Sequence, residues 1–259
     1  MCEIFASIAK RGKNRTVNAQ LQTFYSHCPD HPNGWGLAVL NGKQMSVEKE
    51  PKKATKSDYL QSRLTVPVNQ PVVLAHIRYA TIGNIDYNNT HPFQEQDMYG
   101  RTYTLIHNGT IFEYAPLNAY VHTQAGETDS ERILLYLVDR LNEAALHKGG
   151  PLTAEERFGV LEEELAPMAK GNKLNIILYD GEWLYVHKNF PGALHYREDA
   201  YGVTISTQPL SEGGWLPVRD TTLLAYCEGV LVKEGRSHEN EYVENAEDYK
   251  HLYQIFSGL

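Results

Sequence analysis

The sequence predicts an α+β fold in which most strands pair antiparallel. Apolar runs of strand length recur along the whole chain, whereas few segments have the apolar spacing of a helix. Strands and helices do not alternate one for one, as they would in a doubly wound sheet. In addition, Asn41-Gly42 and Asp180-Gly181 lie between predicted strands, and both pairs favour the tight turns of β-hairpins because they tolerate positive φ.

The predicted strands extend from the beginning to near the end of the chain. They comprise residues 3–9, 35–40, 72–79, 103–107, 174–179, 183–187, 202–206, 223–227 and 229–232. No repeat and no linker rich in Pro, Ser or Gly divides the sequence, so we expect a single domain over residues 2–259. The polar, acidic stretch over about residues 233–259 is expected to be a peripheral extension that packs on the core or on a partner.

Two helices have clear start signals. Thr128 precedes Glu131 by three residues, and Thr153 precedes Glu156 in the same way. In this capping box the hydroxyl and the carboxylate each accept a backbone N–H at the helix start. Apolar residues at helical spacing follow each box, which predicts one helix after each threonine. A shorter helix is expected near residues 18–27.

Composition excludes several classes of protein. Apolar residues make up 42% and charged residues 22% of the chain, as in an ordinary globular protein. The net charge of -8 argues against a nucleic-acid-binding surface, and no apolar run is long enough to cross a membrane. We expect no secretory signal, because no charged region precedes the first apolar residues and Glu3 interrupts them, and the 3 cysteines predict no disulfide framework. We therefore expect a reducing, cytoplasmic setting.

Cys2 is the first candidate for chemistry. Its position alone is more typical of a small buried residue at the start of a strand. If Met1 is removed, however, Cys2 carries both a thiol and a free α-amine. An α-amine with a pKa of roughly 7.7–8.0 can take the proton of its own thiol at neutral pH. Nucleophile and base are then supplied by one residue, without a separate catalytic histidine.

Two further candidates lie between residues 33 and 93. The segment Asn-Gly-Trp-Gly at 33–36 leads into a strand, and its glycines form either a simple turn or a place of close backbone approach. Arg78 follows an apolar strand, where its guanidinium is suited to hold a carboxylate bidentately or to form an internal salt bridge. His76 and His91 are suited to hold loops by hydrogen bonds.

Of the last two candidates, one precedes the first strong helix signal and the other lies within it. Asn108 and Gly109 follow an apolar strand, which suggests either a hairpin turn or an oxyanion hole made of one side-chain amide and one backbone N–H. Asp129 lies in the first turn of the predicted helix, where the helix dipole favours a carboxylate. The same carboxylate is able to bind a substrate ammonium.

Taken together and in this order, these segments resemble the class II glutamine amidotransferase domain, a family of the N-terminal-nucleophile hydrolases. The resemblance rests on Cys2, Asn-Gly-Trp-Gly at 33–36, His-Ile-Arg-Tyr-Ala-Thr at 76–81, Thr-His-Pro-Phe at 90–93, His-Asn-Gly at 107–109 and Thr-Asp-Ser-Glu at 128–131. It continues more weakly through residues 204–210. Asn33 and Glu127 depart from the family pattern, in which aspartate is frequent at both positions.

The resemblance implies a four-layer αββα sandwich with two stacked, mainly antiparallel sheets. It assigns the nucleophile to Cys2 and the oxyanion hole to Asn108 and Gly109. The substrate-binding residues that it implies are Arg78, Thr81, His91 and Asp129, with Arg78 on the α-carboxylate and Asp129 on the α-ammonium of glutamine. No metal or organic cofactor is expected.

Three functions remain open at this point. The first is hydrolysis of glutamine through a γ-glutamyl thioester, by a stand-alone glutaminase or by a subunit whose ammonia is used by a separate acceptor enzyme, since we expect no room for a synthase domain. The second is hydrolysis of a larger γ-glutamyl amide or peptide, and the third is a non-catalytic binding or regulatory subunit. A zinc site of Cys2, His76, His91 and His107 has acceptable ligands but no common zinc spacing, and it leaves Arg78 unexplained.

Overall fold

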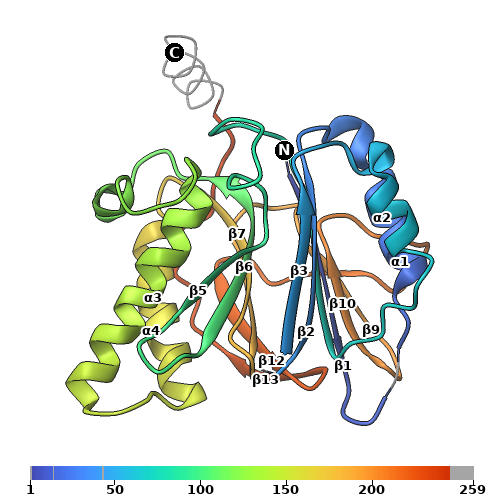
Figure 1. Cartoon of the computed structure of the whole chain (residues 1–259). Coiled ribbons are helices and arrows are strands. Elements are labelled where there is room, and N and C mark those ends of the chain that lie inside the picture. Colours follow the sequence, from blue (N-terminus) through green and yellow to red (C-terminus); the bar gives the residue numbers. More distant parts are fainter. Residues whose placement is uncertain (1, 14, 43, 246–259) are drawn as a thin grey trace.

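The computed structural model describes residues 2–13, 15–42 and 44–245, which form four layers (Figure 1). Two sheets lie face to face, and every strand pairing within the described ranges is antiparallel. Helices α1 (Asn18–Ser26) and α2 (Asp58–Arg63) cover the outer face of one sheet. Helices α3 (Asp129–Lys148) and α4 (Ala154–Ala169) cover the other. The predicted α+β class and αββα sandwich are confirmed.

The first sheet has 7 strands, with the N-terminal strand at its centre. In spatial order they are β11 (Leu216–Pro217), β9 (His195–Glu198), β10 (Gly202–Ser206), β1 (Glu3–Ala9), β4 (Val72–Ile77), β2 (Trp35–Asn41) and β3 (Gln44–Glu50). Glu3 on β1 pairs with Ile77 on β4. The antiparallel register therefore brings Cys2, one residue before β1, beside Arg78, one residue after β4.

The second sheet has 6 strands. In spatial order they are β13 (Val230–Glu234), β12 (Thr222–Cys227), β8 (Leu184–Lys188), β7 (Lys173–Tyr179), β6 (Thr102–Thr110) and β5 (Phe93–Gln96). In the pairing of β6 with β7, Asn108 lies opposite Asn175 and Thr110 opposite Lys173. The end of β6 and the start of β7 therefore lie together at one end of the sandwich.

Both capping signals mark helix starts as predicted. The Thr128 hydroxyl accepts the N–H of Glu131 at the start of α3, and Thr153 and Glu156 form a reciprocal capping box at the start of α4. The short helix expected near residues 18–27 is observed as α1. The 3₁₀ helices are Cys28–Asp30, Ala54–Lys56 and Ala115–Tyr120.

Alternation along the strands decides which side chains face the space between the sheets. Ile4, Ile106 and Ile177 belong to the apolar cluster between the sheets. Since successive strand residues point to opposite faces, even positions on β1 and β6 and odd positions on β7 face this space. Separate apolar clusters join each sheet to its covering helices.

Several elements differ from the prediction. Strands β3, β5, β9 and β11 were not predicted, and the strand expected over residues 72–79 ends at Ile77. Strands β3, β5 and β11 form sheet edges, where one side needs no strand partner and the residues can remain polar. The hairpin alternative for Asn108 and Gly109 is wrong because β6 continues through both residues to Thr110.

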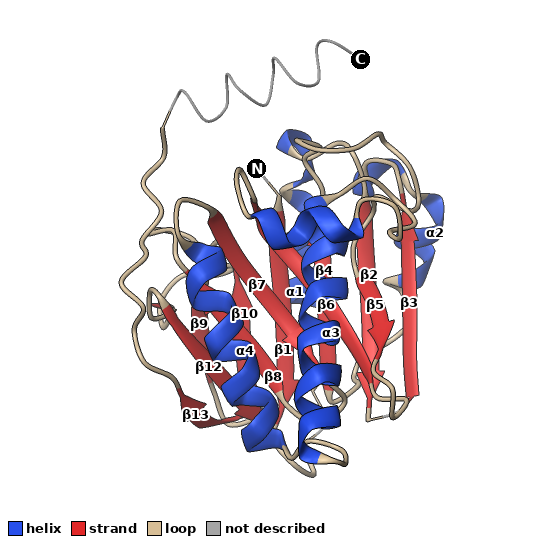
Figure 2. Ribbon diagram, turned by 90° about the vertical axis from the view of Figure 1, so that its left-hand side faces the viewer, coloured by secondary structure: helices blue, strands red, loops and turns tan. Residues whose placement is uncertain are grey.

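The C-terminal segment is attached to the second sheet. Strand β13 continues through Glu234, so the predicted start of an extension at residue 233 falls inside a strand. Beyond it, the N–H groups of Gly235, His238 and Tyr242 donate to carbonyl oxygens of residues 223, 221 and 189, respectively. The segment runs from β13 to the end of the sandwich where the chain begins (Figures 1 and 2). The rest of the predicted extension, residues 246–259, lies outside the described residues.

Candidate active site

The sulfur of Cys2 lies at one end of the sandwich. Its thiol donates to the carbonyl oxygen of Tyr79, and the N–H of Tyr79 lies within hydrogen-bond reach of the sulfur, both at 3.3 Å. Burial raises the pKa of the Cys2 thiol, and the hydrogen bond with the Tyr79 backbone lowers it. The positive charge of Arg78 also lowers this pKa. The sulfur is thus fixed next to a cationic side chain.

The guanidinium of Arg78 holds the loop that follows β4. Nη1 donates to the carbonyl oxygen of Asn84 at 2.8 Å, and Nη2 donates to those of Ile82 and Gly83 at 2.9 and 3.1 Å. The residue is only 2% exposed. Within the described ranges no ion pair includes Arg78, so the internal salt bridge considered above is not formed. Thr81 lies half-buried in the same loop.

Asn108 faces the space between the sheets at the end of β6. Its Nδ2 donates to Oγ1 of Thr207 at 3.3 Å, and the same oxygen accepts the N–H of Ile4 at 2.9 Å. Thr207 therefore links the amide to the strand that follows Cys2. Asn108 is 2% exposed, and its buried Oδ1 has no hydrogen-bond partner among the described residues. A buried polar atom without a partner is uncommon, which marks this amide as a candidate for binding a ligand.

Gly109 is required by close packing rather than by a turn. A Cβ at this position would lie 1.9 Å from the carbonyl oxygen of Lys173 and 2.4 Å from Nε2 of His107. Only glycine fits this space without a shift of the neighbouring strand. The amide of Asn108 and the backbone of Gly109 are therefore held at the same strand end.

Asp129 lies at the buried start of α3, close to the end of β6. Its Oδ2 accepts the N–H of Ile111 at 2.8 Å, and its Oδ1 accepts the N–H of Ser130 at 2.9 Å. The negative charge of Asp129 raises the pKa of the Cys2 thiol, which places the carboxylate within electrostatic reach of the sulfur. The structure thus brings Cys2, Arg78, Asn108 and Asp129 to one end of the sandwich.

The histidines lie deeper, between the sheets. The rings of His76 and His91 stack with their centroids 3.9 Å apart, and Nε2 of His76 lies 3.2 Å from the carbonyl oxygen of His107. Burial lowers the pKa of His76 to about 3 and the pKa of His91 well below its usual range. His91 is therefore a neutral, buried ring that packs on the strand leading to Arg78.

The remaining motif residues position the backbone around the site. A Cβ on Gly36 would lie 1.9 Å from the carbonyl oxygen of His91, so the close-approach interpretation of residues 33–36 is confirmed. Oδ1 of Asn33 accepts the N–H of Ala80 at 3.0 Å. The carboxylate of Glu127 accepts the N–H of Asn84 at 2.8 Å. Both departures from the family pattern thus hold the loop after Arg78.

Lys173 is the residue near the site that sequence reasoning missed. It is 1% exposed at the start of β7, and burial lowers the pKa of its ammonium group to about 8. A signal was present in the sequence, because Lys173 and Asn175 are polar residues in phase with the inward-facing Ile177. A charged residue at an inward position of an otherwise buried strand requires an explanation.

Neither a metal site nor a membrane-spanning helix is found among the described residues. In the described part of the chain, no three His, Cys, Asp or Glu side chains come together in a way that could hold a metal ion. Cys2, His76, His91 and His107 thus do not form such a group. Among the described helices, none combines the length and the apolar character needed to span a membrane.

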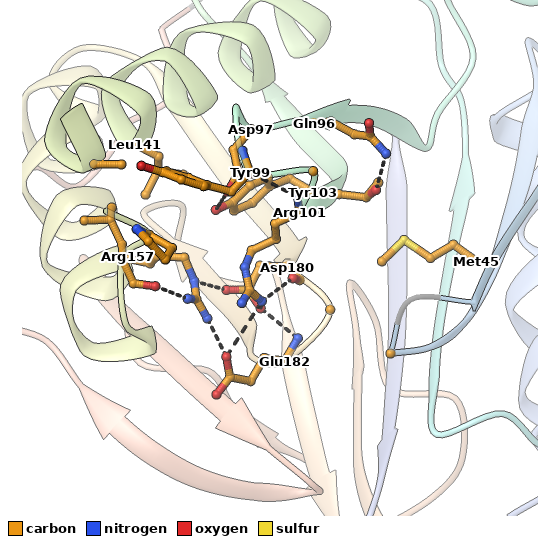
Figure 3. A pocket seen from close by; sticks show the side chains of 17 residues that line it. Met45, Gln96, Asp97, Tyr99, Arg101, Tyr103, Leu141, Arg157, Asp180 and Glu182 are labelled. Atoms are coloured by element: carbon orange, nitrogen blue, oxygen red, sulfur yellow. Dashed lines mark hydrogen bonds and ion pairs between the residues drawn. The ribbon is translucent and has the colours of Figure 1, made fainter. Parts of the chain in front are cut away.

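A second polar cluster lies at the opposite end of the sandwich, beside a cavity of about 650 Å³ (Figure 3). Oδ2 of Asp180, directly after β7, accepts from Nε of Arg157 at 2.6 Å and from the hydroxyl of Tyr185 at 2.8 Å. Nη2 of Arg157 donates to Glu182 at 2.7 Å. This cluster contains none of the site residues predicted from the sequence.

Comparison of the sequence with known families identifies one match over most of the chain. The family described as class-II glutamine amidotransferases matches residues 1–199. An uncharacterised protein of Methanocaldococcus jannaschii is 26% identical over an alignment of 259 positions, which covers 90% of this chain and 71% of that protein. YafJ of Escherichia coli is 31% identical over 158 residues, covering 61% of this chain and 60% of YafJ.

The fold is also found in solved structures. Glutamine phosphoribosylpyrophosphate amidotransferase of B. subtilis superposes with a TM-score of 0.66 at 15% identity. The superposition covers 93% of this chain but 50% of the amidotransferase. A glutamine aminotransferase class-II domain protein from Silicibacter pomeroyi has a TM-score of 0.58 at 16% identity, covering 94% of this chain and 100% of that one.

Proposed function

Because this chain belongs to the class II glutamine amidotransferases, we propose that it hydrolyses the side-chain amide of glutamine through a thioester on Cys2. The observation that carries this proposal is the placement of the Cys2 sulfur beside Tyr79 and Arg78, with Asn108 joined to the following strand through Thr207. A nucleophile, a buried amide and a guanidinium thus meet at one end of the sandwich.

The reaction proceeds in two steps. After removal of Met1, the α-amine of Cys2 takes the thiol proton, and the sulfur bonds to the side-chain carbonyl carbon of glutamine. The carbon–nitrogen bond then breaks, and ammonia leaves with the proton that the α-amine returns. Water next attacks the γ-glutamyl thioester, which releases glutamate and restores the thiol.

The other site residues bind the substrate or stabilise developing charge. Asn108 and Gly109 stabilise the oxyanion of the tetrahedral intermediate. For this, the side-chain amide of Asn108 rotates by a half-turn, so that Nδ2 takes the position of the unpartnered Oδ1 and donates to the oxyanion. Asp129 binds the α-ammonium group, and Arg78 binds the α-carboxylate when the loop carbonyls release some of its N–H groups. Thr81, in the loop that Arg78 holds, adds a hydrogen bond to the substrate.

His91 contributes to substrate binding as part of the interior wall, since its ring is buried and neutral. The thiol of Cys2 must stay reduced for this chemistry, which suits a cytoplasmic protein. The ammonia is either released or passed to a separate acceptor enzyme.

The decisive experiment uses the full-length protein and its Cys2→Ala variant. Wild-type protein should release glutamate from glutamine and should gain the mass of one adduct when treated with a glutamine-like electrophile. Cys2→Ala should lose both properties while keeping the wild-type melting temperature. Hydrolysis that persists in Cys2→Ala would refute the proposed nucleophile. A trimmed, folded wild-type protein that forms no adduct and cleaves no amide would instead support the binding-subunit alternative.

A further inference from the structure

Lys173 shares the inward face of the second sheet with the proposed oxyanion residue. Odd positions of β7 face the first sheet, as Ile177 does, and the even position of Asn108 on β6 faces the same space. Nδ2 of Asn175 donates to the carbonyl oxygen of Asn108 at 2.7 Å, and Lys173 lies two residues before Asn175, towards the site. The same alternation on β1 turns Cys2 inward.

The ammonium group of Lys173 is buried at this end of the sandwich. Its Nζ lies 3.4 Å from the centroid of the Phe190 ring, a cation–π contact. Burial lowers the pKa of Lys173, whereas the carboxylate of Glu244 and the thiolate form of Cys2 favour its protonated form. The charge also lowers the pKa of His107 on β6. Lys173 is thus within electrostatic reach of the nucleophile.

The C-terminal segment builds the wall around this lysine. The ring of Tyr242 stacks on Phe112 with centroids 5.7 Å apart and lies 6.0 Å from that of Phe190. The N–H of Tyr242 donates to the carbonyl oxygen of Asn189 at 2.7 Å. Because Phe112 follows the strand end that carries Asn108 and Gly109, residues 240–245 belong to the surroundings of the site.

A second buried cation is not explained by hydrolysis of glutamine alone. Glutamine has one carboxylate, which the proposed function assigns to Arg78. Its leaving group, ammonia, carries no negative charge, so an additional ammonium group offers it no attraction. A γ-glutamyl amide whose amine part is an amino acid carries a second carboxylate, close to the bond that breaks. A buried cation beside the nucleophile matches that second carboxylate.

We propose that Lys173 is a specificity residue that binds a carboxylate on the leaving-group half of the substrate. The preferred substrates are then γ-glutamyl amides of amino acids or peptides, and the inference rests on the proposed function of Cys2. The same two steps apply, with the amino acid leaving in place of ammonia. Glu244, on the exposed end of the described segment, competes with the substrate carboxylate for the ammonium group.

The test compares two substrates that differ in one charge. γ-Glutamylglycine has a carboxylate on its leaving group, whereas γ-glutamyl methylamide does not. For wild-type protein, kcat/KM should be at least about tenfold higher for γ-glutamylglycine, a difference of about 1.4 kcal/mol. Glutamine is assayed in parallel. If glutamine is cleaved and the two amides react equally, the inference about Lys173 fails while the proposed function stands.

The pH dependence of this ratio gives a readout that needs no substitution. Because kcat/KM reports ionisation of the free enzyme, ionisation of Cys2 and its α-amine affects both substrates and cancels in the ratio. Arg78 and Asp129 face the glutamyl half, which the two substrates share. Lys173 loses its charge above a pKa of about 8. The preference for γ-glutamylglycine should therefore fall between pH 7 and pH 9, and a constant ratio would contradict the proposal.

Substitutions of Lys173 distinguish a role in binding the substrate carboxylate from a role in packing. Lys173→Met should lower the ratio of the two kcat/KM values at least tenfold, and Lys173→Arg should retain part of it. Lys188→Met is the matched control, because Lys188 is also 1% exposed and its Nζ lies 3.0 Å from Oδ1 of Asp220. The control should keep the wild-type ratio. An equal loss on all three substrates in Lys173→Met would assign the lysine a structural role only.

Discussion

The two ends of the sandwich carry buried polar clusters of opposite character. At the far end, Asp180 and Arg157 bond to each other and to their neighbours, and neither has a buried polar atom without a partner (Figure 3). At the end of Cys2, Oδ1 of Asn108 and both ring nitrogens of His91 are buried without a hydrogen-bond partner among the described residues. The buried polar atoms of Asp180 and Arg157 all have hydrogen-bond partners, whereas some of those at the Cys2 end have none in the described part of the chain.

This difference separates a structural network from a functional one. A buried ion pair that is fully hydrogen-bonded resists disruption, because removing one partner leaves the other charge uncompensated. Unpaired buried polar groups lower stability, and they persist where a ligand completes them. The far end is therefore expected to govern stability, and the Cys2 end is expected to govern catalysis. The following substitutions test that division.

The largest effect is expected at the far end. In Asp180→Ala the buried Nε of Arg157 and the hydroxyl of Tyr185 both lose their acceptor. The free energy of unfolding should fall by about 3–5 kcal/mol, measured by chemical denaturation. The remaining folded protein should hydrolyse glutamine at the wild-type rate per active site. A stable Asp180→Ala variant with impaired turnover would reverse the roles of the two ends.

Asn108→Ala should show the opposite pattern. Loss of one oxyanion donor should lower kcat about 10²–10³-fold. The melting temperature should change little, because within the described ranges the Asn108 side chain makes one hydrogen bond of 3.3 Å, to Thr207, and its Oδ1 already lacks a partner. Steady-state kinetics and thermal denaturation of the same preparation test both statements. A rise in KM with unchanged kcat would instead make Asn108 a residue that binds the ground state.

Arg78→Ala should weaken capture of the substrate. Its charge-assisted contacts to the α-carboxylate exist before the transition state, so KM should rise by about 10–100-fold with a smaller change in kcat. Arg78→Lys keeps the charge but not the bidentate geometry and should recover part of the loss. A change confined to kcat would place Arg78 outside the substrate-binding role.

The smallest effect is a dependence of stability on pH. The folded-state pKa of His91 lies below its unfolded value of about 6.5, so below that pH the unfolded chain binds the extra proton. Each such histidine lowers the free energy of unfolding by up to about 1.4 kcal/mol per pH unit below pH 6.5. His91→Phe should reduce this slope between pH 6.5 and 5.5, measured by urea denaturation. An unchanged slope would mean that His91 is not buried as a neutral ring.

Much of the fold follows from local patterns. The capping boxes at Thr128 and Thr153 and the apolar strands β1 and β10 lie where the sequence predicts them. Edge strands such as β3 were missed, because the alternation in β3 is limited to Met45 and Val47 and is followed by a run of charged residues. Local backbone preference and apolar periodicity are properties of neighbouring residues, and a single sequence reports them directly.

The sequence by itself determined the family motifs, their order and the residues Cys2, Arg78, Asn108 and Asp129. Only the tertiary structure decided that Arg78 holds its own loop, that His91 stacks in the interior, and that Lys173 and the C-terminal segment belong to the surroundings of the site. Hydrogen-bond partners and the electrostatic environment depend on segments that are distant in sequence. Their contacts arise only when the two sheets pack together, so no local pattern predicts them.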